Sequence, residues 1–270
     1  MSDRWRLTRG IGSCSLLALA LGLGLLTGGC AGRSDDVTGS IAPNAAGTSD
    51  SNVRRRVEEL AERYRREPAN PQIAIDYAQA LRATGQRAQA VAVLEQATIA
   101  NPGNQPLLAG YGRALADNGN SQAAFDVLSR AHTPDRPDWR ILSVQGTALD
   151  KLGKHEEARR YYNTALKIVP DEPSVLSNLG LSYMLTRELP NAEQTLRRAY
   201  GDPRADGRVR QNLALVVGLQ GRFAEAESIA KGDLPADEAT ANVTYLREML
   251  NRKDPRGGKT VPVAALNRPD

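Results

Sequence analysis

Few side chains in this sequence have the chemistry for catalysis or metal binding. The chain has two histidines, His132 and His155, and two cysteines. His155-Glu156-Glu157 begins like the zinc-protease motif, but Arg159 stands where the second histidine ligand would have to be. The sequence has no glycine-rich phosphate loop, no G-x-S-x-G motif and no zinc-binding cysteine pair. It therefore predicts a protein that is not an enzyme and that holds no metal.

Residues 1–29 have the organisation of a secretory signal peptide. A basic region with three arginines precedes an apolar segment, 11–26, which ends in small residues. A membrane-spanning helix needs about 20 strongly apolar residues. This segment is shorter and contains several glycines, so cleavage is the better interpretation.

Cys30 is the residue best placed for covalent chemistry. The segment Leu26-Thr27-Gly28-Gly29-Cys30 resembles a bacterial lipobox, in which the cysteine receives a diacylglycerol and becomes the mature N-terminus; Thr27 departs from the usual leucine. The alternative is ordinary cleavage with Cys30 incidental. Because Cys14 lies in the leader, the mature chain would hold no disulfide. A lipid on Cys30 is thus the only prosthetic group expected, and Ala31 after it favours the periplasmic face of a Gram-negative outer membrane.

Composition sets the expected role of the segments outside the core. Residues 30–52 are rich in small polar side chains and are expected to form a flexible, lipid-anchored tether. The net charge of the precursor is only +4, which argues against a nucleic-acid partner. Arginine clusters at 54–56 and 65–66 are expected on a solvated helix face; a weak attraction to anionic lipid is the alternative.

Small residues that recur every 34 positions predict the fold. Glycines stand at 85, 119, 153 and 221, with Arg187 at the skipped position, and alanines stand at 90, 124, 158, 192 and 226. This is the period of the tetratricopeptide (TPR) repeat, a helix-turn-helix unit. Such units stack into a solenoid that binds other chains. The sequence therefore predicts an all-α fold, a TPR α-solenoid of about five repeats.

The repeat boundaries follow from this register. The solenoid is expected over 53–250, with repeats at 71–104, 105–138, 139–172, 173–206 and 207–235. Amphipathic segments at 53–66 and 236–250 are expected to form N- and C-terminal capping helices. His132 is expected in the second helix of repeat two, and residues 251–270 are expected to be a disordered tail.

The expected partner-binding surface is a groove lined by positions 2, 5, 9, 12 and 13 of each repeat's first helix. Position 5 carries no lysine, which excludes the carboxylate clamp of chaperone-binding arrays. An apolar set in repeats four and five is expected to bind one face of a partner helix. The alternative is that the C-terminal cap folds back and covers this set. The candidate binding residues are Gln72, Gln79, Arg82, Arg113, Arg140, Asp150, Lys151, Leu181, Met184, Leu185, Gln211 and Leu215.

The last third of the chain carries a more specific resemblance. The segments 208–216, 233–235 and 242–247, together with the lipoprotein-like N-terminus, resemble the TadD-type TPR lipoproteins of the tight adherence (Tad/Flp) pilus system. That resemblance implies a non-enzymatic, pilotin-like accessory at the outer membrane, with the pilus secretin or other assembly proteins as partners. The alternative is another envelope scaffold, which serves outer-membrane protein assembly or peptidoglycan hydrolases.

Overall fold

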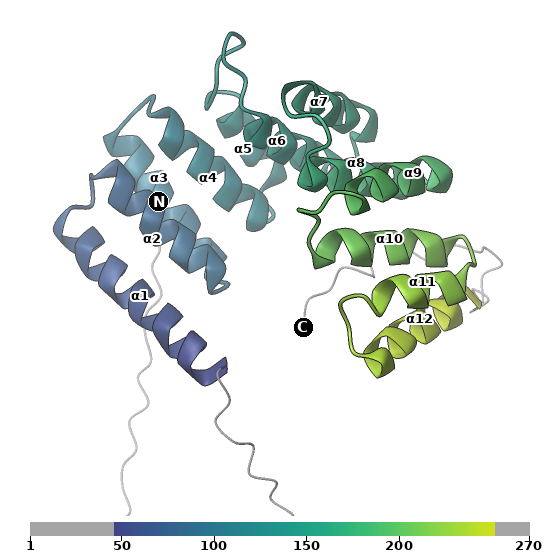
Figure 1. Ribbon diagram of the computed structural model, residues 1–270. Helices are drawn as coiled ribbons and strands as arrows, with labels where there is room; N and C mark the ends of the chain where they lie inside the picture. The colour runs from purple at the N-terminus through teal and green to yellow at the C-terminus, as the bar shows by residue number, and fades with distance from the viewer. Residues whose placement is uncertain (1–45, 252–270) are drawn as a thin grey trace, which may run out of the picture. The chain divides into compact units, whose positions relative to one another are not determined.

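The protein is described by a computed structural model that covers residues 46–251, with side chains from Asn52 onward. These residues form twelve α-helices and no strand (Figure 1). The helices are α1 (Ala46–Arg66), α2 (Pro71–Ala83), α3 (Arg87–Ala100), α4 (Gln105–Asp117), α5 (Ser121–Leu128), α6 (Trp139–Lys151), α7 (His155–Ile168), α8 (Pro173–Leu185), α9 (Leu189–Tyr200), α10 (Gly207–Leu219), α11 (Phe223–Ala230) and α12 (Ala236–Asn251).

Helices α2 to α11 form five antiparallel pairs, and the expected all-helical TPR solenoid is confirmed. We call the first helix of each pair helix A and the second helix B. The five A helices begin at the first residues of the five expected repeats, which are Pro71, Gln105, Trp139, Pro173 and Gly207. Proline at the first position leaves out an N–H that a helix cannot use there, and Asn70 caps α2 by accepting from the backbone N–H groups of Gln72 and Ile73.

The turn between helix A and helix B requires a left-handed residue. Gly85, Gly119, Gly153 and Gly221 have φ between +76° and +87° at this position. Arg187 occupies it in the fourth repeat with φ +62°. Glycine adopts such angles without steric cost, whereas a residue with a Cβ is strained there. The period of the glycines is therefore the period of the turns.

In repeats two to four, helices A and B cross closely because helix A has a glycine at the crossing. A Cβ on Gly146 would lie 2.5 Å from Tyr162 Cε1, and a Cβ on Gly180 would lie 2.6 Å from Leu196 Cγ. Both distances are shorter than real Cβ contacts. The B-helix side chain fills the space that the missing Cβ leaves, which joins the two helices of a repeat tightly.

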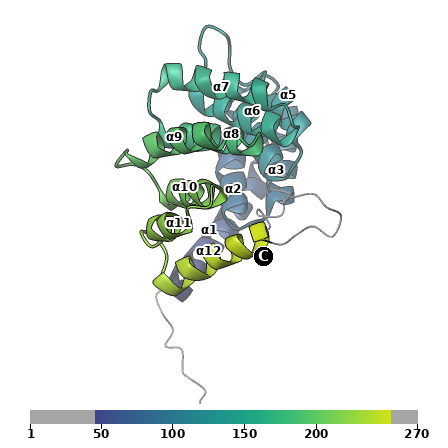
Figure 2. The same ribbon diagram turned by 90° about the vertical axis from the view of Figure 1, so that its right-hand side faces the viewer.

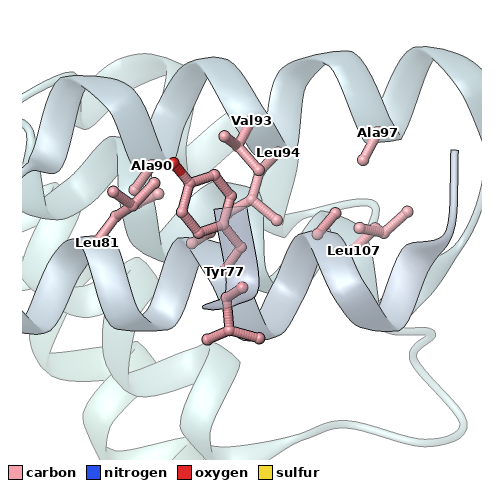
Figure 3. Close-up of a cluster of buried hydrophobic side chains, with 11 residues drawn as sticks. Tyr77, Leu81, Ala90, Val93, Leu94, Ala97 and Leu107 are labelled. Carbon is pink, nitrogen blue, oxygen red and sulfur yellow. The ribbon is translucent and has the colours of Figure 1, made fainter. Parts of the chain in front are cut away.

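The hydrophobic core runs through the repeats as clusters shared between neighbours. Figure 3 shows the first cluster, where Tyr77 and Leu81 of α2 meet Leu94 of α3 and Leu107 of α4. Leu60 of α1 belongs to the same cluster. Since each cluster joins one repeat to the next, stability comes from interfaces between neighbours along the chain.

Helices α1 and α12 occupy the two ends of the array. α1 packs on α2 through Leu60, Ala61 and Tyr64, as expected for a cap. It begins at Ala46, however, so residues 46–52, which were expected in the tether, are helical; no proline stands between Pro43 and Pro68 to end the helix. At the other end, α12 lies beside α10 and α11 (Figure 2). The expected leader, Cys30, residues 30–45 and 252–270 lie outside the described residues.

The second repeat has a shorter helix B than expected. α5 ends at Leu128, so His132 lies in the segment between α5 and α6 and not in a helix. Pro134 and Pro137 disfavour helical backbone at Thr133 and Arg136, so a helix could not extend through this segment. The correction moves His132 to a loop, where its Nε2 lies 3.3 Å from Gln145 Oε1.

Candidate protein-binding face

The A helices of the five repeats lie side by side. Each A helix contacts the A helix of the next repeat, from α2 through α10, whereas successive B helices do not contact one another to a comparable extent. We call the surface formed by positions 2, 5, 9, 12 and 13 of these A helices the A-helix face. It carries the twelve candidate binding residues on neighbouring helices, although the structure gives them different environments.

Three leucines form an apolar part of the A-helix face on α8 and α10. Leu181 and Leu215, both at position 9, are half-buried against the cluster between repeats four and five. Leu185 at the end of α8 is 40% exposed, one of the few large apolar side chains that the described residues leave exposed. A solvent-exposed leucine next to two half-buried ones can take an apolar side chain from a partner.

Met184 does not belong to this apolar surface. Its side chain is only 4% exposed and lies in a core cluster with Leu213 and Val217 of α10. Position 12 of one A helix points towards the next A helix, so Met184 joins repeat four to repeat five. Its prediction as a binding residue was wrong for that reason.

The C-terminal helix α12 continues the stack and does not fold back over α8. α12 contacts α10 and α11 through Ala239, Val243 and Leu246. Leu246 lies against Gly218 of α10, where a Cβ would be 2.5 Å from Leu246 Cδ2. Among the described helices, α12 packs mainly against α10 and α11 and not against α8. It therefore leaves Leu185 exposed.

Polar side chains tie the A helices of repeats one to three together. Arg82 of α2 donates from Nε to Asp117 Oδ2 of α4 at 2.6 Å. Lys151 of α6 donates from Nζ to the Ala116 carbonyl oxygen of α4 at 2.9 Å. Both contacts span one repeat boundary, so Arg82 and Lys151, two of the predicted binding residues, also set the spacing of neighbouring helices.

Asp150 is a structural residue and not a free ligand of the A-helix face. Its carboxylate accepts hydrogen bonds from Tyr162 OH at 2.9 Å and Ser182 Oγ at 2.8 Å, and it lies 2.8 Å from His155 Nδ1. Burial and the nearby Asp150 charge raise the pKa of Tyr162. Since its carboxylate is engaged by three side chains of α7 and α8, Asp150 joins α6, α7 and α8, which corrects its prediction as a binding residue.

Four further predicted residues keep exposed side chains. Gln72 donates to Asp76 Oδ1 at 2.8 Å, whereas Gln79 and Gln211 have no side-chain hydrogen bond among the described residues. Arg140 is exposed and stacks on the Trp139 ring, 4.5 Å from its centroid. These side chains are available to a partner.

Arg113 of α4 is half-buried on the same face. Burial and the neighbouring Arg82 and Arg140 charges lower its pKa, against the opposing effect of Asp138 and Asp117. Sequence reasoning placed Arg113 on the face but could not show which residues surround it.

Two asparagines at the repeat boundaries were not singled out from the sequence. Asn178 Nδ2 donates to Ser143 Oγ at 3.1 Å, and Asn212 Nδ2 donates to Ser177 Oγ at 2.9 Å. Asn178 and Asn212 recur at the 34-residue period, a signal that could have found them. They fix the register of neighbouring A helices below the binding positions.

Within residues 46–251, no three histidine, cysteine, aspartate or glutamate side chains lie close enough to hold a metal ion. None of the described helices combines the length and the apolar character that a membrane span requires.

Comparisons with known proteins agree with this geometry. Two family models described as tetratricopeptide repeat match residues 81–145 and 144–209. No curated protein matches the chain in sequence. Among solved structures, a TPR protein of Thermus thermophilus is 22% identical, with a TM-score of 0.58 over 66% of this chain and 100% of that one.

Two further structures share the fold. PilW, described as a widely conserved type IV pilus biogenesis factor, is 16% identical, with a TM-score of 0.62 over 74% of this chain and 94% of its own. The APC/C assembly Cut9–Hcn1 is 13% identical with a TM-score of 0.58, and the match covers 75% of this chain and 41% of that one. Proteins of this repeat class are generally non-enzymatic scaffolds that bind protein partners. The repeat register, the packing and the two matched family models together show a solenoid of tetratricopeptide repeats.

Proposed function

We propose that this protein is an outer-membrane lipoprotein that acts as a pilotin-like accessory in assembly of a Tad/Flp pilus. Its A-helix face binds a segment of a protein partner, either the outer-membrane secretin or another pilus assembly protein. Cys30 carries the lipid anchor and holds the solenoid at the periplasmic face of the outer membrane.

The observation that carries the binding role is the exposure of the A-helix face. Leu185 is 40% exposed beside the half-buried Leu181 and Leu215, although the packing between repeats four and five is completed by other side chains such as Met184. Exposed apolar side chains grouped on a folded surface mark interaction sites. An amphipathic helix of a partner would bury them.

The pilus assignment rests first on the resemblance of segments 208–216, 233–235 and 242–247 to TadD-type lipoproteins. Within the segment 233–235, Asp233 forms an ion pair with Arg210 of α10 and so holds the chain between α11 and α12. A solenoid of similar fold, PilW, is a type IV pilus biogenesis factor. A TPR array of this size therefore serves a pilus system in at least one other protein.

The anchoring step is tested by Cys30→Ser. In cells that lack the wild-type gene, a plasmid copy of wild-type protein should restore surface pili and the outer-membrane secretin multimer. Cys30→Ser should leave an unprocessed or mislocalised protein and restore neither. Cys14→Ser, which changes the leader's own cysteine, is the matched control and should restore both.

Two results would count against the proposal. Normal processing and outer-membrane fractionation of Cys30→Ser would show that Cys30 is not the anchor. Normal piliation in the deletion strain, together with a general loss of outer-membrane proteins, would assign the chain to a different envelope scaffold.

A further inference from the structure

Arg113 differs from the other buried arginines of the molecule. Among the described residues, four arginines are buried fully or in part, and three of them have a carboxylate partner. The pairs are Arg82 with Asp117, Arg159 with Glu188 and Arg210 with Asp233. Arg113 forms no ion pair and no side-chain hydrogen bond within residues 52–251. A planar group with five N–H donors is thus left without a protein acceptor in the described part of the chain.

The acidic side chains nearest to Arg113 are already engaged. Asp117 accepts from Arg82 Nε at 2.6 Å, and Asp138 caps α6 by accepting from the Arg140 backbone N–H at 2.7 Å. Leaving a partly desolvated cation without an acceptor is unfavourable. No carboxylate in the described part of the chain forms an ion pair with Arg113, and its half-buried side chain can still accept one from a partner.

The surroundings of Arg113 favour an anion of a protein. Arg82 of α2 and Arg140 of α6 act on Arg113 electrostatically from the two neighbouring A helices, and these three guanidinium groups outnumber the two carboxylates, Asp117 and Asp138, that also act on Arg113. The exposed Leu185 lies on the same face, on α8. A segment with both acidic and apolar side chains can contact both Arg113 and Leu185, whereas a small anion can contact only Arg113.

We infer that Arg113 binds a carboxylate of an acidic partner segment, with Arg140 as a second cation beside it. This inference rests on the proposed function, because it takes the A-helix face to be the surface that binds a partner. Arginine suits the role, since its fork geometry allows two parallel hydrogen bonds to one carboxylate. The partner's specificity for this protein then depends on an aspartate, a glutamate or a C-terminal carboxylate.

The test is a selection of random peptides displayed on phage against the full mature protein in wild-type, Arg113→Met and Arg160→Met forms. Arg160 is an exposed arginine of helix B and is the matched control. Wild type and Arg160→Met should both enrich peptides with acidic residues. Arg113→Met should lose that enrichment and should bind the selected peptides about tenfold or more weakly. Its melting temperature should be unchanged or higher, because an unpaired charge has been removed.

A second arm leaves the protein unchanged. Selected peptides in which glutamate is replaced by glutamine, or the C-terminus is amidated, should show which carboxylate binds wild-type protein. Selection of apolar peptides without acidic enrichment, or equal binding of acidic peptides to Arg113→Met, would overturn the inference and leave the binding role intact. Inorganic phosphate that displaces the peptides at low concentration would assign Arg113 to a small anion and would also overturn it. Failure to enrich any peptide on wild type would overturn both the inference and the proposed function.

Discussion

The skipped glycine of the fourth repeat provides a direct test of the turn geometry. Arg187 has φ +62° where the other four repeats have glycine. The turn around it is otherwise the same: the Arg187 N–H bonds to the Met184 carbonyl at 3.0 Å, as the Gly153 N–H bonds to the Asp150 carbonyl at 3.0 Å. The Arg187→Gly variant should therefore be more stable than wild type.

The expected gain follows from two opposing terms. A left-handed backbone costs a residue with a Cβ about 1–2 kcal/mol. Glycine loses more conformational entropy on folding than arginine does, which lowers the free energy of unfolding by about 0.4–1 kcal/mol and offsets part of the gain. Arg187 is exposed and has no ion pair or side-chain hydrogen bond among the described residues, so none is lost. We expect a net increase of about 0.5–1 kcal/mol in the free energy of unfolding, or roughly 1–4 °C in melting temperature.

Urea unfolding and thermal melting by circular dichroism measure this change. Arg187→Ala is the control, because it removes the charge and keeps the Cβ; it should give no such gain. The reverse change, Gly153→Ala, should cost about 1 kcal/mol, and it is informative because a Cβ at Gly153 would have no atom within 4 Å to clash with. Equal stability of Arg187→Gly and Arg187→Ala would refute the reasoning from backbone strain.

Two further predictions concern the packing and the charges of the array. Gly146→Ala should destabilise the protein by about 1–3 kcal/mol in urea unfolding, because its Cβ would lie 2.5 Å from the buried Tyr162 ring; a neutral result would mean that this crossing is looser than described. Burial raises the pKa of Glu193, but hydrogen bonds from Arg222, Gln220 and Arg197 outweigh that effect and lower the pKa to about 2. Because the pKa of Glu193 is lower in the folded than in the unfolded state, the contribution of Glu193 to the free energy of unfolding should be fully present above pH 4.5. This contribution should be lost as the pH drops from 4.5 towards 2. Glu193→Gln should make that fall less steep in urea midpoints measured across this range, and an unchanged slope would show that the Glu193 network contributes nothing.

Much of the fold could be predicted because its signals are local and repeated. Gly153 marks a turn by its own backbone requirement, and Gly146 marks a crossing by the volume it leaves free. Both recur at the repeat period, so each repeat supports the assignment of the next. The start of α1 and the end of α5 were less predictable, since they depend on where prolines stand and not on the repeat.

The binding face could be predicted only in outline. A position in a repeat shows which way a side chain points, and this placed Leu185 and Arg113 on the A-helix face. It does not show which atoms meet that side chain from the next repeat. Met184 is buried by α10, and the Asp150 carboxylate is engaged by Tyr162 and Ser182, because these partners are supplied by other helices.

The central claim, that the A-helix face of α8 and α10 binds a partner, is tested most directly by Leu181→Asp combined with Leu215→Asp. The matched control is Ile99→Asp with Ile168→Asp, two exposed isoleucines on B helices. Surface pili are counted in cells whose only copy is the variant, after its helicity and outer-membrane fractionation have been checked. Loss of such anchors typically weakens a complex by about 2 kcal/mol or more. We predict that the leucine variant folds, fractionates normally and forms no pili, whereas the control forms them. A folded leucine variant with normal piliation, or a leucine variant that unfolds, would contradict the claim.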